Sequence, residues 1–249
     1  MKNLGVMYEY GKGVEKDAAK AAEWYEKAAG LGNAQAMFGL GYMYQYGEGV
    51  ERDYDKAFGW YTKAADLGNA GAMNNLGYMH DKGHGVDEND EKAVELYTKA
   101  AELGDAQAMS NLGYMYDEGH GVDQDYDKAF EWYTKAADLG NADAMCCLGY
   151  MYDEGHGVEQ DYDKAFDWYA IAADLGNIWA MNNLGWMYDQ GHGVDQNYDK
   201  ALEWYTKAAD LGNSTAMNNI GDMYKYGKGV MQDQEKADKW YAIAEEADR

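Results

Sequence analysis

The chain has 249 residues, enough to bury a sizeable core, and its composition of 47% hydrophobic and 27% charged residues is typical of a globular protein. Its 45 acidic residues outnumber 21 basic ones and give a formal net charge of -24, which argues against nucleic acid and anionic membrane surfaces as partners because both would be repelled. No apolar run is long enough for a membrane span and no signal-like leader is present, so we expect a soluble chain whose compartment stays unknown.

One pattern of two elements repeats along the whole chain. The tetrad Gly-x-Gly-Val recurs seven times at intervals of 36 residues, and a methionine opens each interval. Self-similarity at this period predicts a solenoid, in which each repeat buries its apolar face only by stacking on its neighbours. We therefore expect a single domain over residues 1–249, divided into seven repeats at 1–36, 37–72, 73–108, 109–144, 145–180, 181–216 and 217–249.

Each repeat is predicted to form two helices. In residues 73–82 the apolar side chains and Gly77 share one helical face. A mid-helix glycine costs about 1 kcal/mol relative to alanine, so its presence in every repeat indicates that a second helix passes too close for a side chain. The Gly-x-Gly-Val loop ends this first helix. The second begins at an N-cap such as Asp125, buries Tyr133 on one stripe, and is expected to stop at Gly140 and Asn141.

The full pattern A-M-x-x-L-G-Y-M-Y-x-x-G-x-G-V-x-x-D-x-x-K-A-x-x-W-Y-x-K-A-A-x-L-G resembles the Sel1-like repeat, a relative of the tetratricopeptide repeat. The resemblance implies an all-α, right-handed superhelical solenoid of seven antiparallel helix pairs. Because the family works mainly as adaptors that assemble protein complexes, it also implies a non-catalytic scaffold that binds a protein or peptide. The strict 36-residue length and the lack of proline leave a second interpretation open, a consensus-designed or purely structural scaffold without a natural ligand.

The acidic run at residues 123–127 copies the opening of a calcium-binding EF-hand loop. Lys128 stands where that loop needs glycine, and Thr134 stands where it needs a bidentate glutamate. The run is therefore interpreted mainly as a helix cap, with weak cation binding as the alternative.

Four histidines occupy the middle of successive Gly-His-Gly loops, at His84, His120, His156 and His192. Equivalent positions in stacked repeats lie roughly 10 Å apart, too far for one metal ion to collect them. We interpret them as solvated loop residues, with a local pairing to a carboxylate of a neighbouring repeat as the alternative.

No catalytic constellation is visible. The serines Ser110 and Ser214 lack the settings of known nucleophiles, the glycine loops lack a phosphate-binding motif, and the adjacent Cys146 and Cys147 support no disulfide framework. We therefore expect no enzyme, no metal and no cofactor.

Function is expected where the repeats differ, on the face of the first helices, which lines the concave side in tetratricopeptide repeats. A ladder of aromatic side chains, asparagines and carboxylates falls at the variable positions of this face. Single aromatics at helical spacing are usually packing, but as a set they suit an extended peptide, since amides hold a backbone and carboxylates select Lys or Arg. The predicted binding residues are Asn75, Tyr78, Asn111, Tyr114, Asp117, Cys146, Tyr150, Asp153, Trp179, Asn182, Asn183 and Trp186.

Trp179 and Trp186 break the pattern most clearly, seven residues apart on one helical face. They are either an exposed anchor for a ligand or drift, with Trp179 folded onto the preceding helix. The expected partner is a basic protein or peptide, without nucleic acid or membrane, and the expected state is a monomer.

Overall fold

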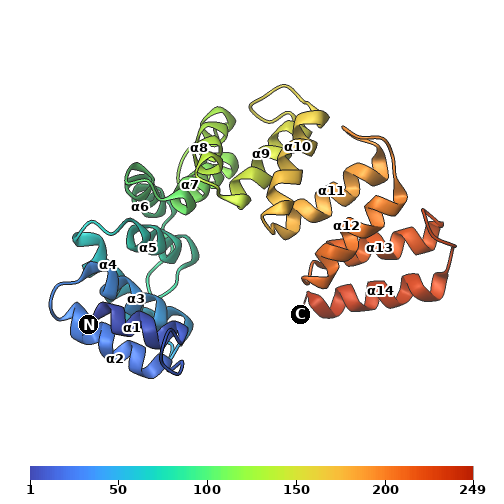
Figure 1. Ribbon diagram of the computed structural model, residues 1–249. Helices are drawn as coiled ribbons and strands as arrows, with labels where there is room; N and C mark the ends of the chain where they lie inside the picture. Colours follow the sequence, from blue (N-terminus) through green and yellow to red (C-terminus); the bar gives the residue numbers. More distant parts are fainter. Residues whose placement is uncertain (249) are drawn as a thin grey trace. The chain divides into compact units, whose positions relative to one another are not determined.

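Over residues 1–248, which the computed structural model describes, the backbone forms fourteen α-helices and no strand, so the predicted succession of helix pairs is confirmed (Figure 1). The helices are α1 Lys2–Tyr10, α2 Ala18–Ala29, α3 Ala34–Tyr46, α4 Tyr54–Asp66, α5 Ala70–Lys82, α6 Asp90–Glu102, α7 Ala106–Glu118, α8 Tyr126–Asp138, α9 Ala142–Glu154, α10 Tyr162–Asp174, α11 Ile178–Gln190, α12 Tyr198–Asp210, α13 Ser214–Tyr226 and α14 Gln234–Ala247. Odd-numbered helices are the first helices of the repeats and even-numbered ones the second.

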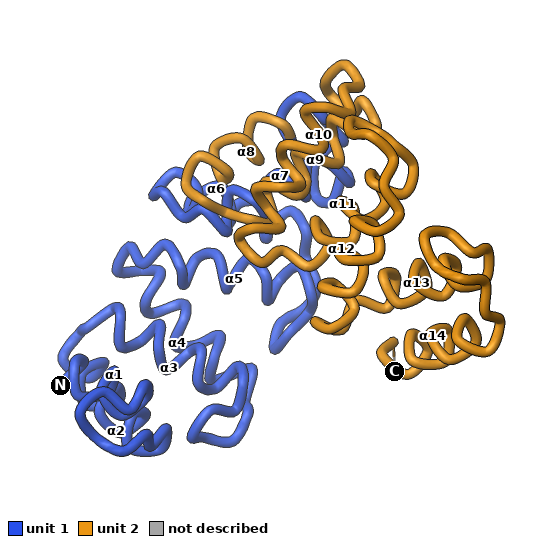
Figure 2. Tube along the Cα trace, turned by 45° about the vertical axis from the view of Figure 1, so that its right-hand side comes forward, with its two compact units in different colours: residues 1–129 blue, residues 130–249 orange. Residues whose placement is uncertain are grey.

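Residue contacts divide the chain into two compact units, residues 1–129 and residues 130–249 (Figure 2). Within each unit a helix packs against the helices before and after it in the chain, as α3 does against α2 and α4. In the first unit the first helices of neighbouring repeats also touch, α3 with α5 and α5 with α7. The repeats therefore stack through both helices of each pair.

Short polar side chains start both kinds of helix. Asp53 Oδ1 accepts a hydrogen bond from the backbone N–H of Lys56 at 3.0 Å, which makes Asp53 the N-cap of α4, as its position in the sequence predicts. Asn141 was expected to help end a helix, but it caps the next one: its Oδ1 accepts from the N–H of Ala144 at 2.8 Å. Gly140 alone, with φ of +85°, turns the chain between the two helices. From the second repeat on, the first helices therefore begin three residues before the methionines that mark the period.

A buried tyrosine from the second helix explains the glycine in the middle of each first helix. A Cβ atom on Gly77 would lie 2.7 Å from Cε1 of Tyr97, and the Tyr97 side chain is only 1% exposed. The predicted close approach is confirmed, and its cause is a ring rather than a backbone. The equivalent tyrosines of the other repeats are buried at Tyr25, Tyr61, Tyr133, Tyr169 and Tyr205, and half-buried at Tyr241 in the last repeat.

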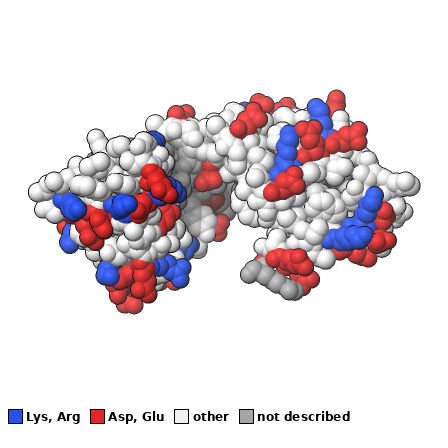
Figure 3. Space-filling model, turned by 60° about the horizontal axis from the view of Figure 1, so that its bottom comes forward, with Lys and Arg blue, Asp and Glu red and all other residues white. Residues whose placement is uncertain are grey.

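The outside of the molecule is strongly charged. Figure 3 shows acidic side chains interspersed with lysine and arginine over the visible face. Among the helices of residues 1–248, none combines the length and the apolar character that crossing a membrane requires.

Candidate functional site

The predicted aromatic ladder is present on the first helices of the first compact unit. Tyr42, Tyr78 and Tyr114 lie at the same position of α3, α5 and α7, and their side chains are 39%, 36% and 41% exposed. Each side chain is therefore partly covered by its repeat and partly open to solvent.

The second compact unit carries the same row with one difference. Tyr150 on α9 is 44% exposed, whereas Trp186 on α11 is half-buried and packs against the apolar cluster of the last repeats. Trp179, in the first turn of α11, is 60% exposed. The sequence left open whether the two tryptophans form an exposed pair or whether Trp179 folds onto the preceding helix. In the structure only Trp179 is open to solvent, and it is not covered by a neighbouring helix.

The asparagines are largely engaged within the protein. Asn111 Nδ2 donates to Asn74 Oδ1 at 2.9 Å across a repeat junction, and Asn219 donates to Asn182 in the same way, also at 2.9 Å. Asn182 is itself only 7% exposed. These amides join neighbouring repeats, so they have fewer donors and acceptors left for a peptide backbone than the sequence indicated.

Two more of the predicted asparagines hydrogen-bond to the hydroxyls of buried tyrosines. Asn75 bonds to Tyr61 and Asn183 bonds to Tyr169. The Tyr61 hydroxyl in turn donates to Gln45 Oε1 at 2.7 Å. This network satisfies polar groups that would otherwise be buried without partners.

A carboxylate, that of Asp153, lies near one of these two tyrosines, Tyr169. Asp117 and Asp153 are half-buried, and burial raises the pKa of the Asp153 carboxyl. At the equivalent position of α11, the Asp189 side chain is 9% exposed and accepts two hydrogen bonds from Lys228 and one from Gln190. These acids lie deeper in the repeat junctions than a row of solvated selectors would.

The loop histidines are not solvated, which corrects the interpretation from the sequence. The His84 ring stacks on the Tyr54 ring of the preceding repeat, with centroids 4.8 Å apart. His192 stacks on Tyr162 at 4.3 Å and meets Trp186 edge-on at 4.9 Å. These two rings therefore lie in the junctions between repeats, and the signal was the tyrosine that opens the second helix of the preceding repeat, Tyr54 or Tyr162.

Among residues 1–248, no group of three or more His, Cys, Asp or Glu side chains could hold a metal ion. Burial raises the pKa of the Cys146 thiol, which disfavours the reactive thiolate at neutral pH.

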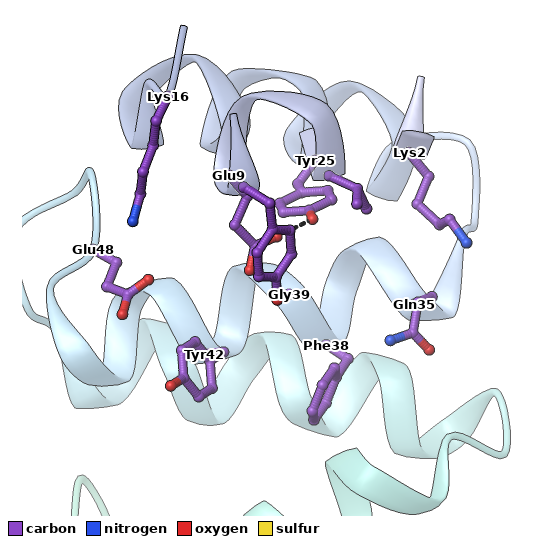
Figure 4. A pocket seen from close by; sticks show the side chains of 11 residues that line it. Lys2, Glu9, Lys16, Tyr25, Gln35, Phe38, Gly39, Tyr42 and Glu48 are labelled. Atoms are coloured by element: carbon purple, nitrogen blue, oxygen red, sulfur yellow. Dashed lines mark hydrogen bonds between the residues drawn. The ribbon is translucent and has the colours of Figure 1, made fainter. Parts of the chain in front are cut away.

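Pockets open at equivalent junctions between successive first helices. The pocket between α5 and α7, about 190 Å³, brings together the predicted residues Tyr78, Asn111 and Tyr114. The pocket between α11 and α13 measures about 200 Å³ and includes Trp186. A larger one of about 740 Å³ lies between α1 and α3 (Figure 4), lined by Lys2, Val6, Glu9, Tyr10, Lys16, Tyr25, Gln35, Phe38, Gly39, Tyr42 and Glu48. The sequence missed this one because its residues differ most from the repeat pattern.

Stacked helix pairs with pockets along one face define an α-helical repeat protein. The model of the Sel1 repeat matches residues 1–33, 34–69, 70–105, 106–141, 142–177, 180–213 and 214–248. The chain therefore belongs to the Sel1 repeat family, whose members are generally non-catalytic scaffolds for protein interactions.

Solved structures agree with this assignment. A Sel1 repeat protein from Oxalobacter formigenes is 35% identical, with 98% of this chain and 96% of that chain covered and a TM-score of 0.87. A protective antigen of uropathogenic Escherichia coli strains is 37% identical with a TM-score of 0.76; 98% of this chain is covered, but it spans only 53% of that protein. An immunity protein from Pseudomonas aeruginosa, 23% identical over 86% of this chain and 82% of its own, has a TM-score of 0.59 and shares the fold alone. No match is found among curated proteins.

Proposed function

We propose that this chain is a scaffold that binds an extended, basic segment of another protein along the face of its first helices, and that it does so as a monomer without catalysis. The observation that carries the proposal is the row of half-exposed aromatic rings on a chain with a net charge of -24. Aromatic faces attract cationic and apolar side chains, and the negative potential favours a basic partner.

The predicted residues have distinct roles in this proposal. Tyr78, Tyr114 and Tyr150 contact side chains of the partner, while Asp117 and Asp153 supply negative charge from the junctions. The asparagines mainly hold the repeats in register.

Trp179 is the proposed anchor. It is among the most exposed large apolar side chains of the second compact unit, and its position on α11 corresponds to that of Gln35 on α3, which lines the pocket between α1 and α3. An exposed tryptophan beside a row of aromatics resembles the residues that dominate measured interfaces, where such an anchor is worth about 2 kcal/mol.

The test uses a fluorescein-labelled peptide of alternating lysine and glycine, and its glutamine analogue, in fluorescence anisotropy. The lysine peptide should bind, its affinity should fall as ionic strength rises from about 0.02 to about 0.3 M, and the glutamine peptide should not bind. Trp179→Ala should weaken binding without changing the melting temperature.

The matched control is Leu175→Ala, which removes an apolar side chain that is 56% exposed in the turn before α11. An affinity that ignores salt refutes the basic partner, and equal effects of the two variants refute Trp179 as the anchor. If neither peptide binds, the purely structural scaffold becomes the better account.

A further inference from the structure

One contact shows what the junction between first helices can hold. Lys228, in the loop after α13, places its Nζ 2.9 and 2.6 Å from the two carboxylate oxygens of Asp189 on α11. The same lysine lines the pocket of about 200 Å³ at this junction. The protein thus supplies its own cation to an acid from the preceding repeat.

The spacing of 39 residues between acid and cation recurs along the chain. At the same spacing, His192 follows Asp153, and its charge lowers the pKa of that carboxyl against the larger effect of burial. In these two junctions the acid therefore faces a basic side chain from the next repeat.

The junction between α1 and α3 breaks this rule. The acid is Glu9, and the residue 39 positions later is Glu48, so two carboxylates line one pocket, whereas Asp153 and Asp189 each have a basic residue at this spacing. In residues 1–248 neither glutamate forms an ion pair. A pocket with two uncompensated carboxylates attracts a cation from outside.

The same pocket is also roomy, at about 740 Å³ against about 190 and 200 Å³ at the two other junctions, and smaller residues stand at two of its positions. Val6 stands where α11 carries Trp186, and Gly39 stands where α13 carries Asn219. The missing side-chain volume leaves space for a long side chain to enter between the two helices.

Aromatic rings and a fixed carboxylate shape the interior. The Tyr25 hydroxyl donates a hydrogen bond to the Glu9 carboxylate, and Phe38 and Tyr42 face the space from α3 (Figure 4). The tyrosine hydroxyl holds the carboxylate in place, and aromatic faces favour a cation beside it.

Two lysines also line this pocket, at separate places. In Figure 4, Lys2 lies beside Gln35 at one end, and Lys16 reaches from the loop after α1 toward Glu48 at the other. Neither lysine is close enough to form an ion pair with Glu9 or Glu48, in contrast to Lys228 on Asp189. The centre of the pocket, around Glu9, therefore has no cation of its own.

We propose that the pocket between α1 and α3 takes a lysine or arginine side chain of the partner, which occupies the place that Lys228 fills between α11 and α13. The proposal rests on the proposed function and specifies which junction selects the basic residue. The aliphatic stem would lie against the aromatic rings while the charged end meets the two glutamates.

The decisive variant is Glu48→Lys, because it installs the cation that the last junction carries. In the full chain it should weaken binding of the lysine–glycine peptide about tenfold, a loss of ~1.4 kcal/mol, and it should raise the melting temperature as the new lysine pairs with Glu9. The control is Glu51→Lys, which makes the same change of charge on an exposed residue outside the pocket. It should weaken binding no more than about twofold, since exposed charges are screened.

The outcomes separate this inference from the function on which it rests. If the wild-type chain binds the peptide but both variants weaken it equally, the pocket is overturned and the proposed function stands. If no peptide binds but Glu48→Lys still raises the melting temperature, the cation pocket is supported and the proposed function is overturned. If binding is absent and the melting temperature does not rise, both fail.

Discussion

Replacing Gly77 by alanine tests how the repeats are held together. The new Cβ would lie 2.7 and 2.8 Å from two carbons of the Tyr97 ring, well inside the 3.5–4.0 Å of an ordinary carbon contact. Tyr97 is buried at 1% exposure and cannot swing away. Overpacking of this kind costs about 3 kcal/mol at its upper range, and the better helix propensity of alanine returns about 1 kcal/mol, which leaves a net loss of about 2 kcal/mol.

Gly59 is the matched control. It also lies inside a helix, α4, but a Cβ there would meet nothing within 4 Å. Gly59→Ala should therefore gain about 1 kcal/mol from helix propensity alone. The two glycine-to-alanine variants should therefore change the free energy of unfolding in opposite directions, and their free energies of unfolding should differ by about 3 kcal/mol.

Urea unfolding followed by far-ultraviolet circular dichroism measures both variants. Adding Tyr97→Leu to Gly77→Ala should restore part of the lost stability, because the smaller side chain frees the space that the new methyl group needs. If Gly77→Ala stabilises the protein as much as Gly59→Ala does, the close approach does not determine the glycine and the packing argument fails.

Two further expectations concern the caps and the stacking. The pKa of Asp161 is lowered first by a hydrogen bond from the backbone N–H of Lys164 and then by one from the Lys164 side chain. The stabilisation of the folded state by this cap is therefore present above the unfolded pKa of ~3.9 and is lost as pH falls through the lower folded pKa. Asp161→Asn, which matches the Asn197 found at the same position of the next repeat, should keep the melting temperature at pH 7 and flatten its fall below pH 4. Asp161→Ala should lower the melting temperature already at pH 7. Identical melting curves for the wild type and both variants at both pH values would refute the cap. Deleting residues 109–144 should leave a shorter chain with helical circular dichroism and a cooperative melt, because stability is distributed along the repeats, and an unfolded product would contradict that.

Most of the fold could be predicted because its signals are local and repeated. Asp125 and its equivalents mark helix starts, and the recurring glycine marks a close approach, so each is legible from a few residues. Asn141 was misassigned because the glycine and asparagine that follow one helix are also the two residues that directly precede the next helix. Only the hydrogen bond from the N–H of Ala144 distinguishes a stop from a cap.

Less of the candidate site could be predicted, because periodicity identifies positions within a repeat but not which side chains of neighbouring repeats meet. Asn111 looked available for a ligand, yet it bonds to Asn74, 37 residues earlier. His192 looked solvated, yet it lies between Tyr162 and Trp186. In each case the partner comes from another repeat, and the contact depends on stacking geometry.

The same geometry explains how such a protein can vary its binding without changing its fold. The glycine and tyrosine that set the helix spacing recur in every repeat, so the backbone at each junction is largely fixed. The residue 39 positions after the acid is free to change: Lys228 neutralises Asp189 and fills its junction, whereas Glu48 leaves Glu9 without an internal cation. Specificity in this chain should therefore be sought in pairs of residues from successive repeats, and substitutions that probe it should be made at that spacing rather than within one repeat.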